Sequence, residues 1–160
     1  MIAQNEAKDD VLLTDEIGEK QMASKNHVRI QRRLTRMLEQ YEPKYEAFPE
    51  LSLELNGTPF IPDISIYPAS PINWQEDVLR EQAPPLLAIE VLSPKQSLTD
   101  LIDKARELLR YGVDEVWVFV PVSEGVIVYP NNGKPRTVGF GEITHAATGI
   151  SINIEKLFAV

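Results

Sequence analysis

Two acidic residues lie inside apolar, strand-like runs of the sequence, Asp63 within 60–67 and Glu90 within 86–92. An ionised carboxylate is rarely buried unless a cation, a partner or a dense set of hydrogen bonds compensates its charge. Lys104 follows on a predicted amphipathic helix. Two acids and one lysine are the smallest set of side chains that can hold a divalent metal ion and orient a water molecule beside a phosphate. The pattern therefore indicates metal-dependent hydrolysis of phosphodiesters.

Each of these residues also has an interpretation without catalysis. Asp63 follows a proline, so it could be a hydrogen-bonded acid at a strand bend. Glu90 could be neutralised by a buried lysine or arginine. Lys104 could form an i, i+4 salt bridge with Asp100, which would contribute only a few tenths of a kcal/mol. The residues alone leave these alternatives open.

The two acids can meet only if their strands are neighbours in one sheet. Residues 51–55 alternate between apolar and polar, and Asn56-Gly57 is a strong signal for a two-residue hairpin. The run 60–67 is therefore predicted to return antiparallel to 51–55. Alternation then places Asp63 on one face of this second strand.

A strand, a helix and a second strand follow in order. Residues 86–92 are almost continuously apolar, which is typical of a central strand covered on both faces. The next helix has a capping box and a closing glycine: Ser97, Asp100 and Gly112. Residues 115–121 form another buried strand, so a βαβ crossover with a parallel pair is expected. Lys104 lies at the rim of the helix's apolar stripe, from which it could reach over the sheet toward the carboxylates.

Further elements complete a single α/β domain predicted for residues 22–160. A helix is expected from Ser24, as its N-cap, to about Tyr41. Residues 69–85 read as a long loop with one short helical turn around 76–82. Short strands are expected near the C-terminus: 125–130, 137–140 and 150–154.

The net charge of −8 argues at first against a polyanionic partner. Half of that excess lies in residues 1–21, a predicted flexible lead-in whose six acidic and two basic side chains give a balance of −4. Four arginines of the first predicted helix recur at helical spacing and so share one stripe: Arg29, Arg32, Arg33 and Arg36. The stripe could contact nucleic-acid phosphates, and it could equally be a solvated face.

Composition narrows the chemistry further. The chain has 160 residues and no cysteine, so one domain is expected and any metal ion would be ligated by oxygen. His27 and His145 lie far apart in sequence and are interpreted as ordinary polar residues. The chain has neither a secretory signal nor an apolar run long enough to span a membrane, so a cytoplasmic location is expected. Homodimer formation stays open.

Several motifs together resemble the Uma2 family of restriction-endonuclease-like proteins, also known as DUF820. The motifs are Pro62-Asp63-Ile-Ser-Ile, Ile89-Glu90-Val-Leu-Ser-Pro94, Asp103-Lys104, Tyr111-Gly112-Val113 and Glu115-Val-Trp-Val. The opening helix from Asn26-His27 and the ending 149–158 are also similar to the family. The resemblance implies the PD-(D/E)XK nuclease fold, a central mixed sheet flanked by helices.

The resemblance also implies roles for individual residues. Asp63 and Glu90, with the backbone carbonyl of Val91, would hold one Mg²⁺ or Mn²⁺. The superfamily's usual lysine position holds Leu92, so Lys104 would take over its role, with Lys95 in the following loop as the lower-ranked alternative. Val120 stands where the family often has an aspartate. Tyr111 and Glu54 are candidate supporting residues.

The function expected from these observations is a metal-dependent endonuclease that acts on nucleic acid, with DNA as the expected substrate. The alternative is a binding or assembly module that kept the nuclease fold and lost the chemistry, with Asp63, Glu90 and Lys104 as a buried ion-pair network. A glycosidase would use two acids but no lysine, and it ranks last.

Overall fold

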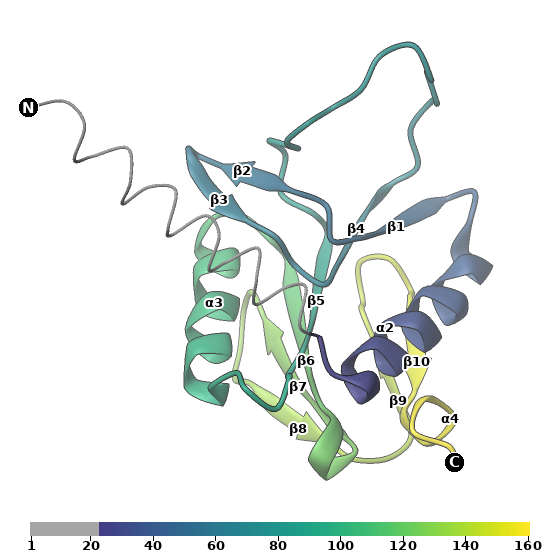
Figure 1. Ribbon diagram of the computed structural model, residues 1–160, viewed down its shortest axis with the longest axis vertical. Helices are drawn as coiled ribbons and strands as arrows, with labels where there is room; N and C mark the ends of the chain where they lie inside the picture. Colours follow the sequence, from purple (N-terminus) through teal and green to yellow (C-terminus); the bar gives the residue numbers. More distant parts are fainter. Residues whose placement is uncertain (1–22) are drawn as a thin grey trace, which may run out of the picture.

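The computed structural model describes residues 23–160 (Figure 1), so the predicted lead-in 1–21 lies outside the described residues. The helices, including two short 3₁₀ turns, are α2 (Lys25–Leu38), η1 (Glu39–Tyr41), α3 (Leu98–Arg110), η2 (Pro121–Ser123) and α4 (Ile154–Leu157). The strands are β1 (Tyr45–Pro49), β2 (Leu53–Leu55), β3 (Thr58–Phe60), β4 (Ile64–Pro68), β5 (Leu87–Val91), β6 (Glu115–Val120), β7 (Gly125–Pro130), β8 (Arg136–Val138), β9 (Glu142–Thr144) and β10 (Ser151–Asn153).

A six-stranded mixed sheet forms the centre of the fold, in the order β1-β4-β5-β6-β7-β8. β5 and β6 are parallel, and α3 connects them, while the other neighbouring strands are antiparallel. The predicted βαβ crossover and the mixed sheet flanked by helices are confirmed. The two remaining strand pairs, β2–β3 and β9–β10, form small separate sheets.

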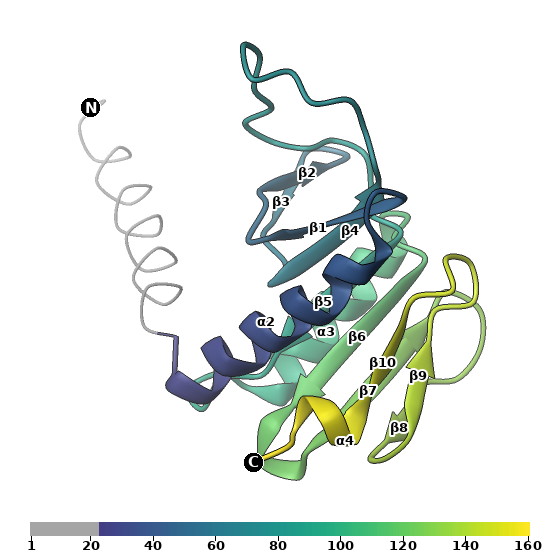
Figure 2. The same cartoon turned by 90° about the vertical axis from the view of Figure 1, so that its right-hand side faces the viewer.

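The sheet is covered on both faces. α2, α4 and the β9–β10 pair pack on one face, and α3 packs on the other, with the β2–β3 hairpin beside it (Figures 1 and 2). Alternation along β5 divides its side chains accordingly, since Ile89 joins the cluster under α2 and Ala88 joins the cluster under α3. Each fully buried leucine or isoleucine contributes about 1.5–3 kcal/mol relative to its exposed state.

The two main helices begin where the sequence predicts. The Ser24 hydroxyl accepts from the His27 N–H at 3.3 Å, and the Ser97 hydroxyl accepts from the Asp100 N–H at 3.4 Å. Gly112 follows α3 with a φ of 103°, a left-handed conformation that glycine adopts without strain. The first helix is shorter than predicted, because its last turn is the 3₁₀ segment η1.

The predicted strand 60–67 is wrong as a single element. The hairpin at Asn56-Gly57 is confirmed, with positive φ at both residues, but it joins only the short strands β2 and β3. The chain then bends at residues 61–63, where Pro62 lacks a backbone donor, and β4 begins at Ile64. β4 pairs with β5 and with β1, a strand that was not predicted.

The long loop 69–85 contains turns but none of the predicted helical structure. Glu81 in this loop forms an isolated parallel bridge with Leu53 of β2. The Tyr67 hydroxyl donates to the Ala83 carbonyl at 2.7 Å, and burial, together with the charge of Glu81, raises the pKa of Tyr67. β9 was also not predicted. No helix among the described residues is long and apolar enough to span a membrane.

Candidate active site

The sheet brings the two acids to the same end of neighbouring strands. Asp63 directly precedes β4, and Glu90 is the penultimate residue of β5. β4 and β5 are antiparallel with Ile64 opposite Ile89, and this register, continued by one residue, sets Asp63 opposite Glu90. Both acids are almost fully buried, at 6% and 2% exposed. The predicted meeting of the two strands is confirmed.

The carboxylate of Asp63 completes the end of the sheet. Its Oδ2 accepts from the backbone N–H of Val91 at 2.7 Å and contacts Nε2 of His27 at 3.2 Å. The Val91 N–H points toward β4, as the N–H of Ile89 does two residues earlier. The chain has turned away from the sheet at Pro62, so the side chain of Asp63 accepts the hydrogen bond that a strand carbonyl would otherwise accept.

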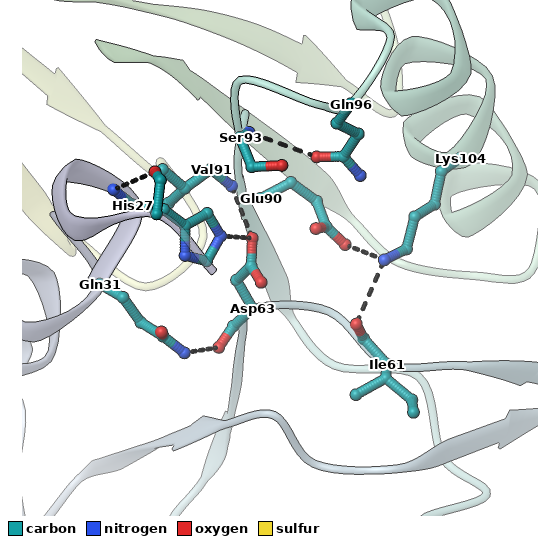
Figure 3. A network of polar contacts seen from close by, with 10 residues as sticks. His27, Gln31, Ile61, Asp63, Glu90, Val91, Ser93, Gln96 and Lys104 are labelled. Atoms are coloured by element: carbon teal, nitrogen blue, oxygen red, sulfur yellow. Dashed lines mark hydrogen bonds and ion pairs between the residues drawn. The ribbon is translucent and has the colours of Figure 1, made fainter. Parts of the chain in front are cut away.

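Glu90 is neutralised from the other side of the site. Lys104 reaches from α3, and its Nζ lies 2.7 Å from Oε1 of Glu90 and donates to the Ile61 carbonyl at 3.2 Å. Figure 3 shows Glu90 between Asp63 and Lys104. The alternative of a local salt bridge to Asp100 is wrong, because Lys104 pairs with Glu90 instead. Lys104 therefore approaches the carboxylates as its position on the helix predicted.

The donor set fits a hard divalent cation. Among residues 23–160, no cluster of three or more His, Cys, Asp and Glu side chains is arranged to hold a metal ion, so an ion would be held by fewer side chains. Mg²⁺ is often bound through one or two carboxylates and keeps several waters. Asp63 and Glu90 supply two buried carboxylates on adjacent strands, where a cation would offset their desolvation in addition to Lys104 and His27. Val91 presents its carbonyl on the same side as its N–H, toward Asp63.

Comparison with known proteins identifies the family. The sequence model of Uma2, described as "Putative restriction endonuclease", matches residues 4–155. The chain belongs to the Uma2 family. Among solved structures, it is similar to a protein from Anabaena variabilis ATCC 29413 described as "a putative nuclease belonging to DUF820", with a TM-score of 0.78 and 24% identity over 86% of this chain and 83% of that chain. No curated protein matches the chain.

These findings confirm the predicted resemblance and the fold. At 24% identity, the likeness to the solved structure shows the fold. The match to the family model shows that the sequence is related to the Uma2 family. The family match supports a nuclease function at the level of the Uma2 family.

The two positions at which this Uma2 chain departs from the family pattern, Leu92 and Val120, are both partly buried. Leu92 is partly buried in the cluster under α3, and its N–H donates to the Phe119 carbonyl at 2.9 Å. Leu92 carries no charge, and the positive charge beside Glu90 comes from the side chain of Lys104. Val120 is partly buried at the end of β6, and its carbonyl accepts from the Ser123 hydroxyl.

The two supporting residues lie around the hairpin of the Uma2 fold. The hydroxyl groups of Tyr111 and Thr58 are hydrogen-bonded at 3.1 Å, and the Tyr111 ring packs on Phe60. Glu54 on β2 lies 3.6 Å from Arg80 in an ion pair near the surface. Tyr111 thus contacts the hairpin that leads to Ile61, whose carbonyl accepts from Lys104. Direct roles of Tyr111 and Glu54 at the site stay predictions.

The four arginines of α2 separate into two kinds. Three are exposed: Arg29, Arg32 and Arg36. Arg32, Arg33 and Arg36 line an open groove together with Gln31 and Pro49. Arg33 is partly buried, and its Nη1 donates to the carbonyls of Leu157 and Ala159, each at 2.7 Å. Arg33 therefore holds the end of the chain against α2 within the Uma2 fold.

Sequence reasoning missed two residues that contact Asp63, His27 and Gln31. The interpretation of His27 as an ordinary polar residue is wrong, because it is 7% exposed and contacts Asp63. His27 and Asp63 are 36 positions apart, so no local spacing could indicate the pair. His145 is also buried, with Nε2 2.7 Å from Oδ2 of Asp114.

Proposed function

We propose that this Uma2 protein is a metal-dependent endonuclease that hydrolyses phosphodiester bonds, with DNA as its substrate. The observation that carries the proposal is the convergence of Asp63, Glu90 and Lys104 at one end of β5 (Figure 3). These residues come from three separate elements, and two of them are buried acids. Uma2 membership supports the same class of reaction.

The proposed roles follow from the chemistry of each group. Asp63 and Glu90, with the Val91 carbonyl, would hold one Mg²⁺ or Mn²⁺. Such an ion supplies a water ligand of lowered pKa and neutralises negative charge on the phosphate. Lys104 carries three N–H donors, and Glu90 and the Ile61 carbonyl take two of them, so one would be left for the attacking water or for a phosphate oxygen. Ile61, whose carbonyl accepts from Lys104, keeps the ammonium beside the carboxylates.

The exposed arginines of α2 support a nucleic-acid substrate. α2 also carries His27, which contacts Asp63, so the helix connects the basic stripe to the site. Guanidinium groups pair well with phosphate oxygens and release counterions on binding. We therefore assign Arg29, Arg32 and Arg36 to the phosphate backbone.

A plasmid assay tests the proposal. Supercoiled DNA is incubated with the full chain and Mn²⁺, beside Asp63→Ala and the control Asp103→Asn. Asp103 is an exposed acid on α3 next to Lys104, paired with Arg106 at 3.8 Å. We expect nicking by the wild type and by Asp103→Asn, and none by Asp63→Ala. Absence of metal-dependent nicking, or nicking that persists in Asp63→Ala, would contradict the proposal.

One observation favours the alternative of a binding module without catalysis. Both acids already have a protein partner, Glu90 in Lys104 and Asp63 in His27. A self-sufficient ion-pair network of this kind would not respond to the metal. A nuclease site would gain thermal stability with Mn²⁺, by about 2.7 kcal/mol when the ion is at 100 times its Kd. Thermal unfolding with and without Mn²⁺ therefore separates the two functions.

A further inference from the structure

α2 holds residue 63 at two points. Nε2 of His27 lies 3.2 Å from the carboxylate Oδ2 of Asp63, and Nε2 of Gln31 donates to the backbone carbonyl of the same residue at 3.2 Å. His27 and Gln31 are four residues apart, so their side chains lie on one face of the helix. Figure 3 shows both contacts reaching Asp63 from α2.

The carboxylate is oriented by converging donors. An ionised carboxylate only accepts hydrogen bonds, so Nε2 of His27 carries the hydrogen in this contact. The Val91 N–H donates to the same oxygen at 2.7 Å. Two donors on one oxygen, one from α2 and one from β5, restrict rotation of the carboxylate relative to Glu90.

Asp63 lies where the pairing of β4 with β5 has ended, so α2 contacts its backbone at a point that β5 does not hold. The paired register of β4 begins at Ile64, and Pro62 cannot donate to a neighbouring strand. The Asp63 carbonyl accepts from the N–H of Glu50 at 3.1 Å, which continues the register of β1 with β4 by one residue, and from Gln31 at 3.2 Å. Side chains of α2 therefore add two contacts to Asp63 beside the one that the β1 side of the sheet provides.

We propose that His27 and Gln31, here called the α2 clamp, position Asp63 for binding of Mg²⁺ or Mn²⁺. This inference rests on the proposed function of the site. The clamp residues are positioning residues, since they touch Asp63. Outer contacts of this kind change metal affinity by about 10- to 100-fold. The clamp also links the cation site to α2, the helix that carries the exposed arginines.

Matched variants separate the hydrogen bond from the volume of the side chain. His27→Leu keeps a side chain of similar size and removes the donor, whereas His27→Gln keeps an N–H donor. Gln31→Met removes the second donor at a partly exposed position. His145→Leu is the control, because His145 is the other buried histidine and contacts Asp114 instead.

The primary measurement is the Kd for Mn²⁺ alone, by titration calorimetry on the full chain, with plasmid nicking as the second readout. We expect Mn²⁺ binding to weaken about tenfold or more in His27→Leu and less in Gln31→Met. His27→Gln should recover most of the affinity. His145→Leu should bind Mn²⁺ like the wild type, even if its melting temperature falls as far as that of His27→Leu.

Each outcome decides between the two proposals. If Asp63→Asn loses Mn²⁺ binding while His27→Leu and Gln31→Met retain it, the clamp is overturned and the proposed function stands. A loss in His27→Leu that His27→Gln does not recover also overturns the clamp, because packing would then explain it. If His27→Leu does not fold, unchanged affinity in Gln31→Met overturns the clamp. A wild type that neither binds Mn²⁺ nor nicks DNA overturns the proposed function itself.

Discussion

His27 and His145 are both buried, and each contacts an aspartate, at 3.2 Å from Asp63 and at 2.7 Å from Asp114. The two regions differ in what surrounds the acid. The side chain of Asp114 is 48% exposed, so water compensates much of its charge. Asp63 is buried and lies opposite a second buried acid, Glu90.

The difference between the two regions shows which feature distinguishes a candidate active site from a structural contact. In the His145 pair, the second ring nitrogen contacts the Thr148 hydroxyl at 2.8 Å, and the pair joins the turn after β9 to the start of β6. This arrangement accounts for the pair as a structural contact. Two buried carboxylates at one strand end require positive charge, and this requirement distinguishes the His27 region from the His145 region.

The largest predicted contrast is between the two aspartates. Asp63→Asn should lower the rate of Mn²⁺-dependent nicking on the order of 10³-fold, because a carboxylate that holds the cation is lost. Asp114→Asn should leave the rate within about twofold, since an exposed acid away from the site contributes little. Initial rates of plasmid nicking measure both variants. Equal losses in the two variants would contradict the distinction between the regions.

The next contrast concerns how much two lysines, one paired with the buried Glu90 and one exposed, contribute to the free energy of unfolding. Lys104→Met should lower the free energy of unfolding by about 2–4 kcal/mol, because Glu90 would lose its counter-charge. The effect should fall below that of a fully buried pair, since the Lys104 side chain is 26% exposed. Lys95→Met, at an exposed loop position, should change stability by less than about 0.5 kcal/mol. Urea unfolding measures both variants.

A double variant checks the cause of that effect. Glu90→Gln removes the buried charge, so Lys104→Met combined with Glu90→Gln should be more stable than Lys104→Met alone. Additive losses in the two single variants would mean that Lys104 contributes packing and not charge.

The histidine of the structural pair should affect stability alone. His145→Leu should lower the free energy of unfolding by about 1–3 kcal/mol, because Thr148 and Asp114 lose their shared partner. Nicking by the folded variant should stay at the wild-type level. Thermal unfolding and the plasmid assay, run on the same preparation, test this prediction. A selective loss of nicking would extend the site to the β9–β10 region.

The smallest effects separate the arginines of α2. Replacing Arg29, Arg32 and Arg36 together by glutamine should reduce the salt dependence of DNA binding by about one unit of slope per phosphate contact. Arg33→Gln should leave the slope nearly unchanged and lower stability by about 1–2 kcal/mol, because two chain-end carbonyls lose their donor. Binding isotherms at several salt concentrations measure the slope. A larger reduction of the salt dependence in Arg33→Gln than in the triple variant would contradict the separation of the arginines into two kinds.

The sequence predicted the elements whose signals are local. The capping box of α3, its closing glycine and the apolar run of β5 gave the crossover that positions Glu90 and Lys104. The family motifs then indicated which acids belong to the site. By contrast, Lys104 had two possible acidic partners, and the choice of Glu90 over Asp100 depends on how α3 packs on the sheet.

The missed features depend on contacts between distant parts of the chain. β1 contains only five residues and ends in a proline, so its strand character comes from pairing with β4. The break between β3 and β4 leaves the Asp63 carboxylate to accept from the N–H of Val91, 28 residues away, and no local pattern indicates this contact. His27 became a site residue only because α2 packs over the end of β5. The DNA substrate and the cytoplasmic location stay predictions, and homodimer formation stays open.

The most direct test of the central claim is the stoichiometry of Mn²⁺ binding to the wild type, Asp63→Asn, Glu90→Gln and Asp114→Asn, measured by electron paramagnetic resonance on the full chain. We predict one Mn²⁺ per chain for the wild type and for Asp114→Asn, and loss of that ion in both site variants. Retention of the ion in Asp63→Asn or Glu90→Gln, or no bound ion in the wild type, would contradict the account of two buried acids that share one cation.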